Sequence, residues 1–326
     1  MTIKPTVLEV KAQHYIPRFY LKGFTDRQRK LWVCEKFKTI RASKPKHEAH
    51  RPDYYTHAEQ GERDETAEDT LEEIESRAAP IVRKLANPAF RPTPEQMGHV
   101  YLFTAFMFAR VPAWRENLDR MFGRVAKEHE LRLAKDKQQF HKMCADMERD
   151  TCKPLNMDAE ELRQYILKGE YEIVQASTAY NLGSMFQSAV HIAGTLQEFG
   201  YEVLYAPIGR FFVTSDSPVF TLRPEPNQQA TIGLGFGWPG VVVHFPLTKR
   251  ACLRLTRAVE PDSMEISEYA LGQINRLTMA NAGQYLYSSE GHRKVSRLFD
   301  QWGCKVAPGK NAFMPTPQPP KKPPLH

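Results

Sequence analysis

Residues 200–222 read GYEVLYAPIGRFFVTSDSPVFTL, and here the apolar pattern of the chain changes from helical to strand-like spacing. Short runs of β-branched and aromatic residues separated by proline and glycine are typical of strands joined by turns. Five such runs follow Gly200, over residues 202–206, 210–214, 218–222, 240–245 and 251–256. They predict a mostly antiparallel sheet over residues 202–256.

The residues before this sheet have the spacing of helices. Apolar side chains recur three and four positions apart, and acids crowd the first turns of the earliest helix, where they favour its dipole. Thr93, followed by Pro94 and Gln96, has the pattern of an N-cap with a capping box. Pro80 is expected to kink or restart the earliest helix, because proline lacks the amide hydrogen that a helix interior uses.

We therefore expect an α+β fold in which a helical layer packs on the mostly antiparallel sheet and C-terminal helices close it. The chain length fits a single large domain. This domain covers residues 1–306, with a basic segment over 1–60, the helical layer over 64–200, the sheet over 202–256 and closing helices over 262–304. Residues 307–326 are rich in proline without core-forming periodicity, and we expect them to be disordered.

Composition indicates a globular protein of a reducing compartment. The longest apolar run, Val100–Ala109, is far shorter than the ~20 residues that a membrane span needs. The first residues lack the apolar core of a signal peptide. The five cysteines are odd in number and show no Cys-x-x-Cys spacing, which argues against a disulfide framework or a zinc knuckle. We expect a cytoplasmic protein without membrane partners.

The net charge of +7 is unevenly distributed. Residues 1–51 hold 13 lysines and arginines against 4 acids, a net charge of +9. Residues 59–75 then hold nine acids against one arginine, a net charge of −8. Two interpretations are open: the basic segment faces phosphate while the acidic one faces water, or the two lie against each other and cancel.

Residues 13–24, QHYIPRFYLKGF, are the best candidate for chemistry. A histidine can act as acid, base, ligand or hydrogen-bond donor near neutral pH, and Pro17 fixes the backbone three residues after His14. A histidine between aromatic residues is equally typical of a hydrogen-bonded core position. His14 therefore lies either in a functional cleft or in the core.

Ser215 and Asp216 follow an apolar strand, a position where sites are often assembled. Asp216 is either catalytic or a cap of its own backbone in a turn before Pro218. Arg18 and Arg110 each lie near a proline and aromatic residues. Such an arginine pairs with a buried acid, here Asp216 or Glu75, or clamps a phosphate, and ion pairing is the favoured interpretation.

Several other patterns predict no chemistry. The glycines of residues 233–237 are followed by no helix start or Gly-Lys-Ser/Thr, so they indicate a turn between strands. His47, His50 and His57 lack cysteine partners and helical register, so they are expected at the surface and not around zinc. No serine stands in a Gly-x-Ser-x-Gly elbow, which disfavours a serine hydrolase.

An ordered set of short motifs resembles a bacterial family catalogued as domain-of-unknown-function family 4238, over roughly residues 12 to 290. The motifs are His14-x-x-Pro17-Arg18-Phe19-Tyr20-Leu21, Asp53-Tyr54-Tyr55-Thr56, Glu72 to Glu75 before Ala78-Ala79-Pro80, Arg110-x-Pro112 and Thr214-Ser215-Asp216-Ser217-Pro218-Val219. The chain departs from the family pattern at Ser217, where asparagine is usual, and at His244, where the strand is usually aliphatic. The resemblance supplies a pattern but no activity.

The candidate residues predict a hydrolytic site for nucleic acid. His14 would take a proton from water or a ribose hydroxyl, and Asp216 would orient the imidazole or hold a cation. Arg18 or Arg110 would stabilise the charge that develops on a phosphoryl oxygen. The expected substrate-binding residues are Ser215, Lys11, Lys22 and Asn181. No residues have the spacing of a metal site, so no cofactor is predicted, although a divalent metal ion would recruit Glu72 or Glu75.

The leading functional hypothesis is a cytosolic bacterial hydrolase, a nuclease-like toxin or antiviral defence effector. The alternative is a non-enzymatic module that binds nucleic acid or protein, with phosphate held by residues 1–51 and a purely structural Ser215-Asp216 turn. A third hypothesis is a helical interaction protein, because residues 114–149 carry balanced charges that indicate a solvated helix or helical hairpin.

Overall fold

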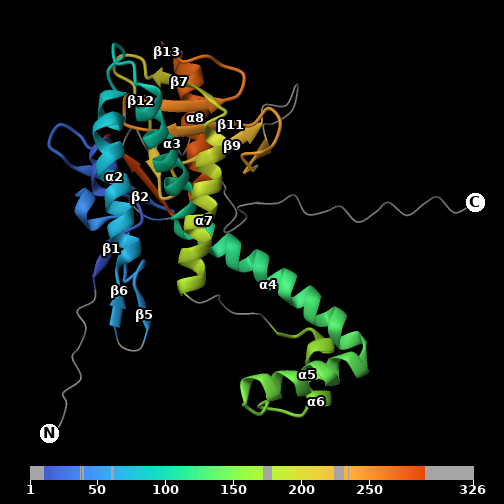
Figure 1. The fold of residues 1–326 in the computed structure, drawn as a ribbon. Helices are drawn as coiled ribbons and strands as arrows, with labels where there is room; N and C mark the ends of the chain where they lie inside the picture. Colours follow the sequence, from blue (N-terminus) through green and yellow to red (C-terminus); the bar gives the residue numbers. More distant parts are fainter. Residues whose placement is uncertain are drawn as a thin grey trace, which may run out of the picture. The chain divides into compact units, whose positions relative to one another are not determined.

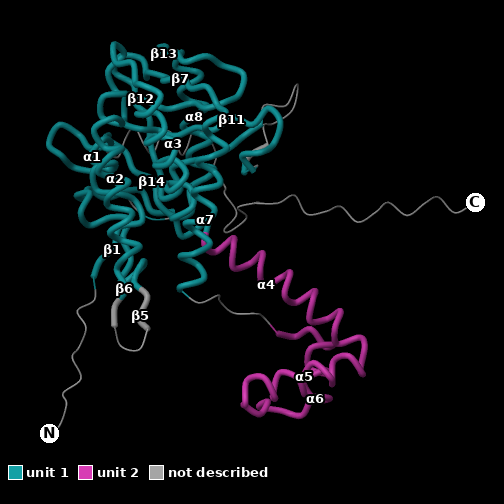
Figure 2. Tube along the Cα trace, viewed as in Figure 1, with its two compact units in different colours: residues 1–114, 178–326 teal, residues 115–177 magenta. Residues whose placement is uncertain are grey.

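The computed structural model describes residues 11–36, 38, 40–59, 62–171, 178–223, 231–233 and 235–290, which form the helices and strands of Figure 1. Helices occur together with largely antiparallel sheets, which confirms the predicted α+β class. The chain divides into two compact units, residues 1–114 with 178–326 and residues 115–177 (Figure 2). The sequence predicts one domain over residues 1–306, whereas in the structure residues 115–177 form a compact unit of their own. The predicted tail, 307–326, lies outside the described residues.

The largest sheet of the described residues has six strands, in the order β10-β9-β11-β12-β7-β13. Its strands are β7 (Gly200–Tyr205), β9 (Phe220–Arg223), β10 (Thr231–Ile232), β11 (Val242–Pro246), β12 (Ala251–Thr256) and β13 (Asp262–Glu265). All neighbours pair antiparallel except β13, which runs parallel to β7. The mostly antiparallel sheet predicted over residues 202–256 is confirmed, and β13 extends it.

A second sheet brings distant parts of the chain together. Its strands, in order, are β3 (Arg41–Ser43), β2 (Leu31–Glu35), β14 (Tyr285–Ser288) and β8 (Thr214–Ser215). Two further antiparallel pairs are β1 (Ala12–His14) with β4 (His50–Pro52), and β5 (His57–Glu59) with β6 (Glu62–Asp64).

One sequence prediction is wrong in this part of the chain. Residues 210–213 are not a strand, because the Phe212 amide donates to the Lys249 carbonyl and the Val213 amide to the Asn275 side chain. Closing helices are predicted over 262–304, a range in which the structure also contains strands β13 and β14. Of these helices the structure describes α8 (Glu268–Asn281), and residues 291–304 lie outside the described residues.

Three helices of the larger unit pack together, with α3 (Pro94–Ala109) between α2 (Thr66–Lys84) and α7 (Thr178–Leu196) (Figure 1). Helix α3 is apolar on nearly every side, as expected for a helix with neighbours all round. The Phe103 ring lies 5.9 Å from the Phe245 ring of β11, so α3 covers one face of the six-stranded sheet.

The helix boundaries follow the capping residues. Thr93 Oγ1 accepts from the Gln96 amide, and the Gln96 side chain accepts from the Thr93 amide, which confirms the predicted capping box. Helix α2 does not restart at Pro80 but runs through it to Lys84. Pro80 has no amide hydrogen to donate to the Ser76 carbonyl, four residues earlier in the helix. Both residues are exposed, so this carbonyl lies next to solvent.

His244 lies in the middle of the six-stranded sheet. It pairs with Phe220 on one side and Arg254 on the other, and its ring stacks on Phe220 at 5.4 Å. The side chain of Arg254 pairs in turn with Glu202. His244 Nδ1 is buried and has no hydrogen-bond partner among the described residues. Burial, with a smaller effect of Arg254, lowers the pKa of His244 to about 3.

His244 is expected to make the fold sensitive to acid. In the folded chain it stays neutral down to a pKa of about 3, whereas an unfolded histidine takes up a proton near pH 6.5. The unfolded state therefore binds more protons, and stability falls as the pH drops from 6.5 towards 3. At pH 5 the loss is about 2 kcal/mol. Urea denaturation at pH 7 and pH 5 should show a loss in the wild type that exceeds the loss in His244→Leu by about this amount, because His14 contributes to both proteins.

The matched control is His191→Gln. His191 is exposed on α7, and its Nδ1 donates to the Gln187 carbonyl oxygen. This variant should keep the acid sensitivity of the wild type, because contributions of the other histidines are common to both proteins. An equal loss in His244→Leu and the wild type would show that His244 is not the sensitive group.

The second unit, residues 115–177, contains most of α4 (Pro112–Lys135), together with α5 (Lys137–Thr151) and α6 (Ala159–Lys168). A small core joins the three helices through Ala134, Phe140, Cys144 and Ile166. Asp136 separates α4 from α5 and caps α5 through the Gln139 amide. Residues 114–149 are therefore helical as predicted, in the form of two helices.

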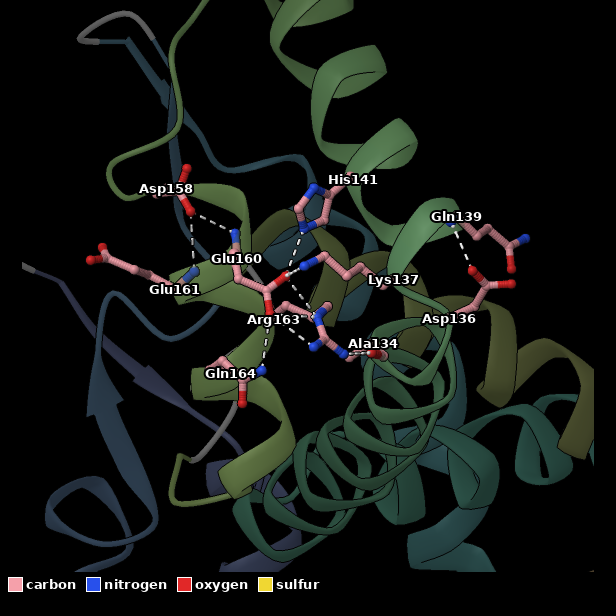
Figure 3. Close-up of polar contacts among 10 residues, drawn as sticks. All are labelled: Ala134, Asp136, Lys137, Gln139, His141, Asp158, Glu160, Glu161, Arg163 and Gln164. Carbon is pink, nitrogen blue, oxygen red and sulfur yellow. Dashed lines mark hydrogen bonds and ion pairs between the residues drawn. The ribbon is translucent and has the colours of Figure 1, made fainter.

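Glu160 is the polar centre of this unit (Figure 3). Its carboxylate accepts from Arg163, Gln164 and the ring of His141, and Lys137 adds an ion pair. These bonds, led by that from Arg163, lower the pKa of Glu160. The network joins α5 to α6.

In the described part of the chain, no helix combines the length and apolar character needed to cross a bilayer.

Candidate functional site

His14 is positioned by the pairing of two short strands. β1 and β4 are antiparallel, with Gln13 opposite Arg51 and His14 opposite His50. The Gln13 side chain is buried and donates to Thr56 Oγ1 at 2.9 Å, while its oxygen accepts from the Tyr55 amide at 2.6 Å. Because neighbouring side chains of a strand point to opposite faces, the anchoring of Gln13 places His14 on the other face.

The chain turns after His14 into a short helix, α1 (Arg18–Lys22). Pro17 precedes the helix with extended ψ, and Tyr20 and Leu21 are buried. The Tyr20 hydroxyl lies 2.6 Å from both Thr214 Oγ1 and the Pro246 carbonyl, so α1 is bound to both sheets. Arg18 and Lys22, on the remaining side of α1, are exposed.

The environment of His14 keeps its imidazole neutral. Burial, followed by the neighbouring His50 and Arg18, lowers the pKa of His14 to about 4, and a hydrogen bond to the Lys46 backbone acts in the opposite direction. Nε2 is buried without a hydrogen-bond partner among the described residues, so the bond to Lys46 uses Nδ1. At neutral pH Nε2 therefore carries a lone pair that can accept a proton.

Exposed basic side chains surround His14. Helix α1 packs against the short 3₁₀ helix η1 (Pro45–His47), and the His50 ring lies 5.3 Å from the His14 ring. We call Arg18, Lys22, Lys46, His47 and His50 the basic cluster; all five are exposed. In the described ranges, no ion pair or side-chain hydrogen bond uses any of its three lysine and arginine side chains.

The acidic segment, residues 59–75, contacts the first described residues of the basic segment. Lys11 Nζ pairs with Glu65 at 2.6 Å, and Gln13 donates to Glu68 at 2.7 Å. Within the basic segment Arg41 pairs with the buried Glu48. Part of the charge therefore cancels as one of the two interpretations expects, whereas the basic cluster keeps its charge exposed.

Arg110 lies behind the backbone of His14. Its side chain is 1% exposed and donates to the Tyr15 carbonyl at 2.7 Å and the His14 carbonyl at 3.3 Å. A third bond reaches Glu75 Oε1 at 2.8 Å, which confirms the ion pairing predicted as the favoured interpretation. The guanidinium thus supports the strand that carries His14. A direct catalytic role for Arg110 stays a prediction.

Asp216 is bound to the turn before β14. Its Oδ1 accepts from the Gly283 amide at 2.8 Å, and its Oδ2 accepts from the Gln284 amide at 2.7 Å and the Tyr285 amide at 3.1 Å. Burial raises the pKa of Asp216, and the three amide bonds oppose this rise. No hydrogen bond or ion pair of the described residues joins Asp216 to His14. Its catalytic role stays a prediction.

The expected substrate-binding residues are dispersed. Ser215 is fully buried in β8, where its hydroxyl accepts from the Ser217 amide. Lys11 is engaged with Glu65, and Asn181 is buried on α7. Lys22 alone among these four belongs to the basic cluster. No group of three or more His, Cys, Asp or Glu side chains in the described ranges is placed to hold a metal ion.

A family model described as a protein of unknown function, DUF4238, matches residues 12–292. The chain belongs to the DUF4238 family. No curated protein and no solved structure matches it significantly. The match runs from β1 to the end of the described residues, so His14, the basic cluster and Asp216 all belong to the DUF4238 region.

The sequence of this DUF4238 protein gave little reason to place His50 beside His14. His50 is expected from its neighbours to be a surface residue, and it is exposed. What the sequence does not show is the β1–β4 register that sets His50 opposite His14. The alternation in each three-residue strand is too short to predict a pairing.

Proposed function

We propose that this DUF4238 protein is a hydrolase of nucleic acid that binds the phosphodiester backbone at the basic cluster around His14. The observation that carries the proposal is His14 Nε2, a neutral, unpartnered acceptor beside exposed cations. A buried polar atom without a partner is uncommon in folded proteins, and functional sites are one of the places where it occurs. Phosphate is the ligand that clustered lysine and arginine side chains favour.

The chemistry follows from these positions. His14 Nε2 takes a proton from the attacking hydroxyl, which is general base catalysis. Arg18 stabilises the charge that develops on the phosphoryl oxygens. Lys22 and Lys46 hold neighbouring phosphates. Arg110 acts as a positioning residue, because it binds the backbone carbonyls of His14 and Tyr15.

The test is cleavage of labelled RNA and DNA oligonucleotides by the purified full chain. His14→Ala should slow cleavage about 10²–10⁴-fold and leave the melting temperature unchanged within a few degrees. His191→Gln is the control, because His191 is an exposed histidine of helix α7 that does not belong to the basic cluster. Equal activity of His14→Ala and the wild type would exclude His14 as the base.

The alternative is a module that binds nucleic acid without cleaving it. The observation that favours it is that Asp216 and Arg110 bind backbone groups, and that no carboxylate of the described residues is hydrogen-bonded to the His14 ring. This alternative predicts affinity that falls steeply with salt and survives His14→Ala. Filter binding at two salt concentrations, with Arg18→Ala as the weakened variant, tests this affinity, and binding without cleavage by the wild type distinguishes the module from the hydrolase.

The proposed biological role is a cytosolic bacterial toxin or antiviral effector, since an unregulated nuclease is harmful to its own cell. Induced expression of the wild type in bacterial cells should then arrest growth, and His14→Ala should not. Growth arrest that persists in His14→Ala would separate toxicity from the proposed chemistry.

A further inference from the structure

The strand pair β1–β4 brings two histidines into contact. Residues directly opposite each other in an antiparallel pair project to the same face. His14 and His50 are such a pair, and their rings lie 5.3 Å apart at an interplanar angle of 55°. The two rings differ in environment, because His14 Nε2 is buried while His50 is exposed.

Cleavage of a phosphodiester requires proton transfers at two different oxygens. The attacking hydroxyl loses a proton, and the leaving oxygen gains one. A neutral, enclosed imidazole is suited to the first transfer. An exposed imidazole is suited to the second, because histidine is a common general acid and an exposed ring is open to the leaving group. Arg18, exposed near His14, supplies the positive charge for the phosphoryl oxygens.

We propose that His50 is the general acid that works with His14, and that the substrate is RNA cleaved by its own 2′-hydroxyl. This inference rests on the proposed function and extends it to a second catalytic residue and a substrate class. The rings at 5.3 Å leave little room between them, so the exposed His50 side chain rotates outward to admit the phosphate.

The reaction proceeds as a transfer within the RNA chain. His14 Nε2 takes the proton of the 2′-hydroxyl, and the 2′-oxygen forms a bond to the adjacent phosphorus. The bond from phosphorus to the 5′-oxygen breaks, and its electron pair leaves with that oxygen, which takes a proton from His50. The products are a 2′,3′-cyclic phosphate and a 5′-hydroxyl. His14 is left protonated and His50 neutral, and exchange with water restores both.

DNA lacks the attacking hydroxyl, so the proposal predicts selective cleavage of RNA. The first substrate is a DNA oligonucleotide with one ribonucleotide in its centre, and the second is the same sequence without it. The wild type should cut only the first, only after the ribonucleotide, and mass spectrometry should find the cyclic phosphate. His50→Ala should slow this cut about 10²–10⁴-fold, and the control His191→Gln, at an exposed histidine of α7 outside the basic cluster, should not.

A third substrate isolates the acid. In it sulfur replaces the 5′-bridging oxygen at the cut site, and a thiolate leaves without being protonated. His50→Ala should cut this substrate at the wild-type rate, whereas His14→Ala should remain slow. Full activity on the sulfur substrate would show that the His50→Ala protein is folded. Its slow cleavage of the oxygen substrate could then not be due to a folding defect, because the same protein preparation is measured on both substrates.

The outcomes separate the two proposals. Equal cutting of the all-DNA substrate, or full activity of His50→Ala on the oxygen substrate, overturns the role of His50 and leaves the nucleic-acid hydrolase standing. A His50→Ala variant that stays slow on the sulfur substrate also overturns the acid role. A wild type that cuts none of the substrates overturns the proposed function itself.

Discussion

Replacing Arg110 by methionine is expected to lower the free energy of unfolding of the larger unit by about 3–5 kcal/mol, because removal of one partner from a buried ion pair leaves the others uncompensated. The Arg110 side chain is 1% exposed. Methionine has a similar length but donates no hydrogen bond, so Glu75 and the carbonyls of His14 and Tyr15 lose their donors. Urea denaturation followed by tryptophan fluorescence measures the loss.

The matched control is Arg77→Met on helix α2. Arg77 also pairs with a glutamate, Glu73, but the two side chains are 58% and 62% exposed. Exposed ion pairs contribute little, so the expected loss is under about 1 kcal/mol. Arg110→Lys should recover only part of the stability, since an ammonium cannot reproduce the fork of the guanidinium. Similar losses in Arg110→Met and Arg77→Met would contradict the structural role of Arg110.

The same geometry limits what an activity loss at Arg110 can mean. Arg110 binds the His14 carbonyl, so its removal disturbs the strand that carries the base. A slower Arg110 variant would therefore not identify a residue that contacts substrate. Arg18 is the better probe of charge stabilisation, because it is exposed and its replacement removes no hydrogen bond found in the described part of the chain.

The parts of the fold that the sequence predicts are those with local causes. The capping box at Thr93 needs only residues within one helical turn, and strand β11 contains two valines and a phenylalanine, which are residues of strand-forming type. Strand β14 has four residues, and its partners β2 and β8 are distant in sequence. Its tyrosines are of strand-forming type, but its pairing with two distant strands has no local cause.

The residues of the candidate site also differ in whether the local sequence identifies them. His14 is identifiable because its residue type and aromatic neighbours are local features. The local sequence around Arg110 and Asp216 does not distinguish a catalytic role from a structural one. Their hydrogen-bond partners are backbone atoms of residues distant in sequence, and these partners show the structural role. His50 can be proposed as the general acid only because the register of β4 with β1 places it opposite His14.

Asp216→Ala is expected to destabilise the four-stranded sheet by about 3–5 kcal/mol, because a hydrogen bond to a charged group contributes about 1.5–3 kcal/mol. Three amides, those of Gly283, Gln284 and Tyr285, lose their acceptor together. Since these amides form the turn into β14, the effect should be greatest there. Hydrogen exchange should show faster exchange over residues 283–288, with little change in helix α3.

Asp26→Ala is the matched control, because Asp26 also accepts from two backbone amides, those of Gln28 and Lys30 at 2.8 Å. Asp26 is partly exposed, so water can replace its carboxylate, and the expected loss is about 1 kcal/mol. Asp216→Asn should fall between the two, since one of its side-chain atoms becomes a donor that faces other donors. Unchanged exchange over residues 283–288 in Asp216→Ala would mean that β2 and β8 hold β14 without the aspartate.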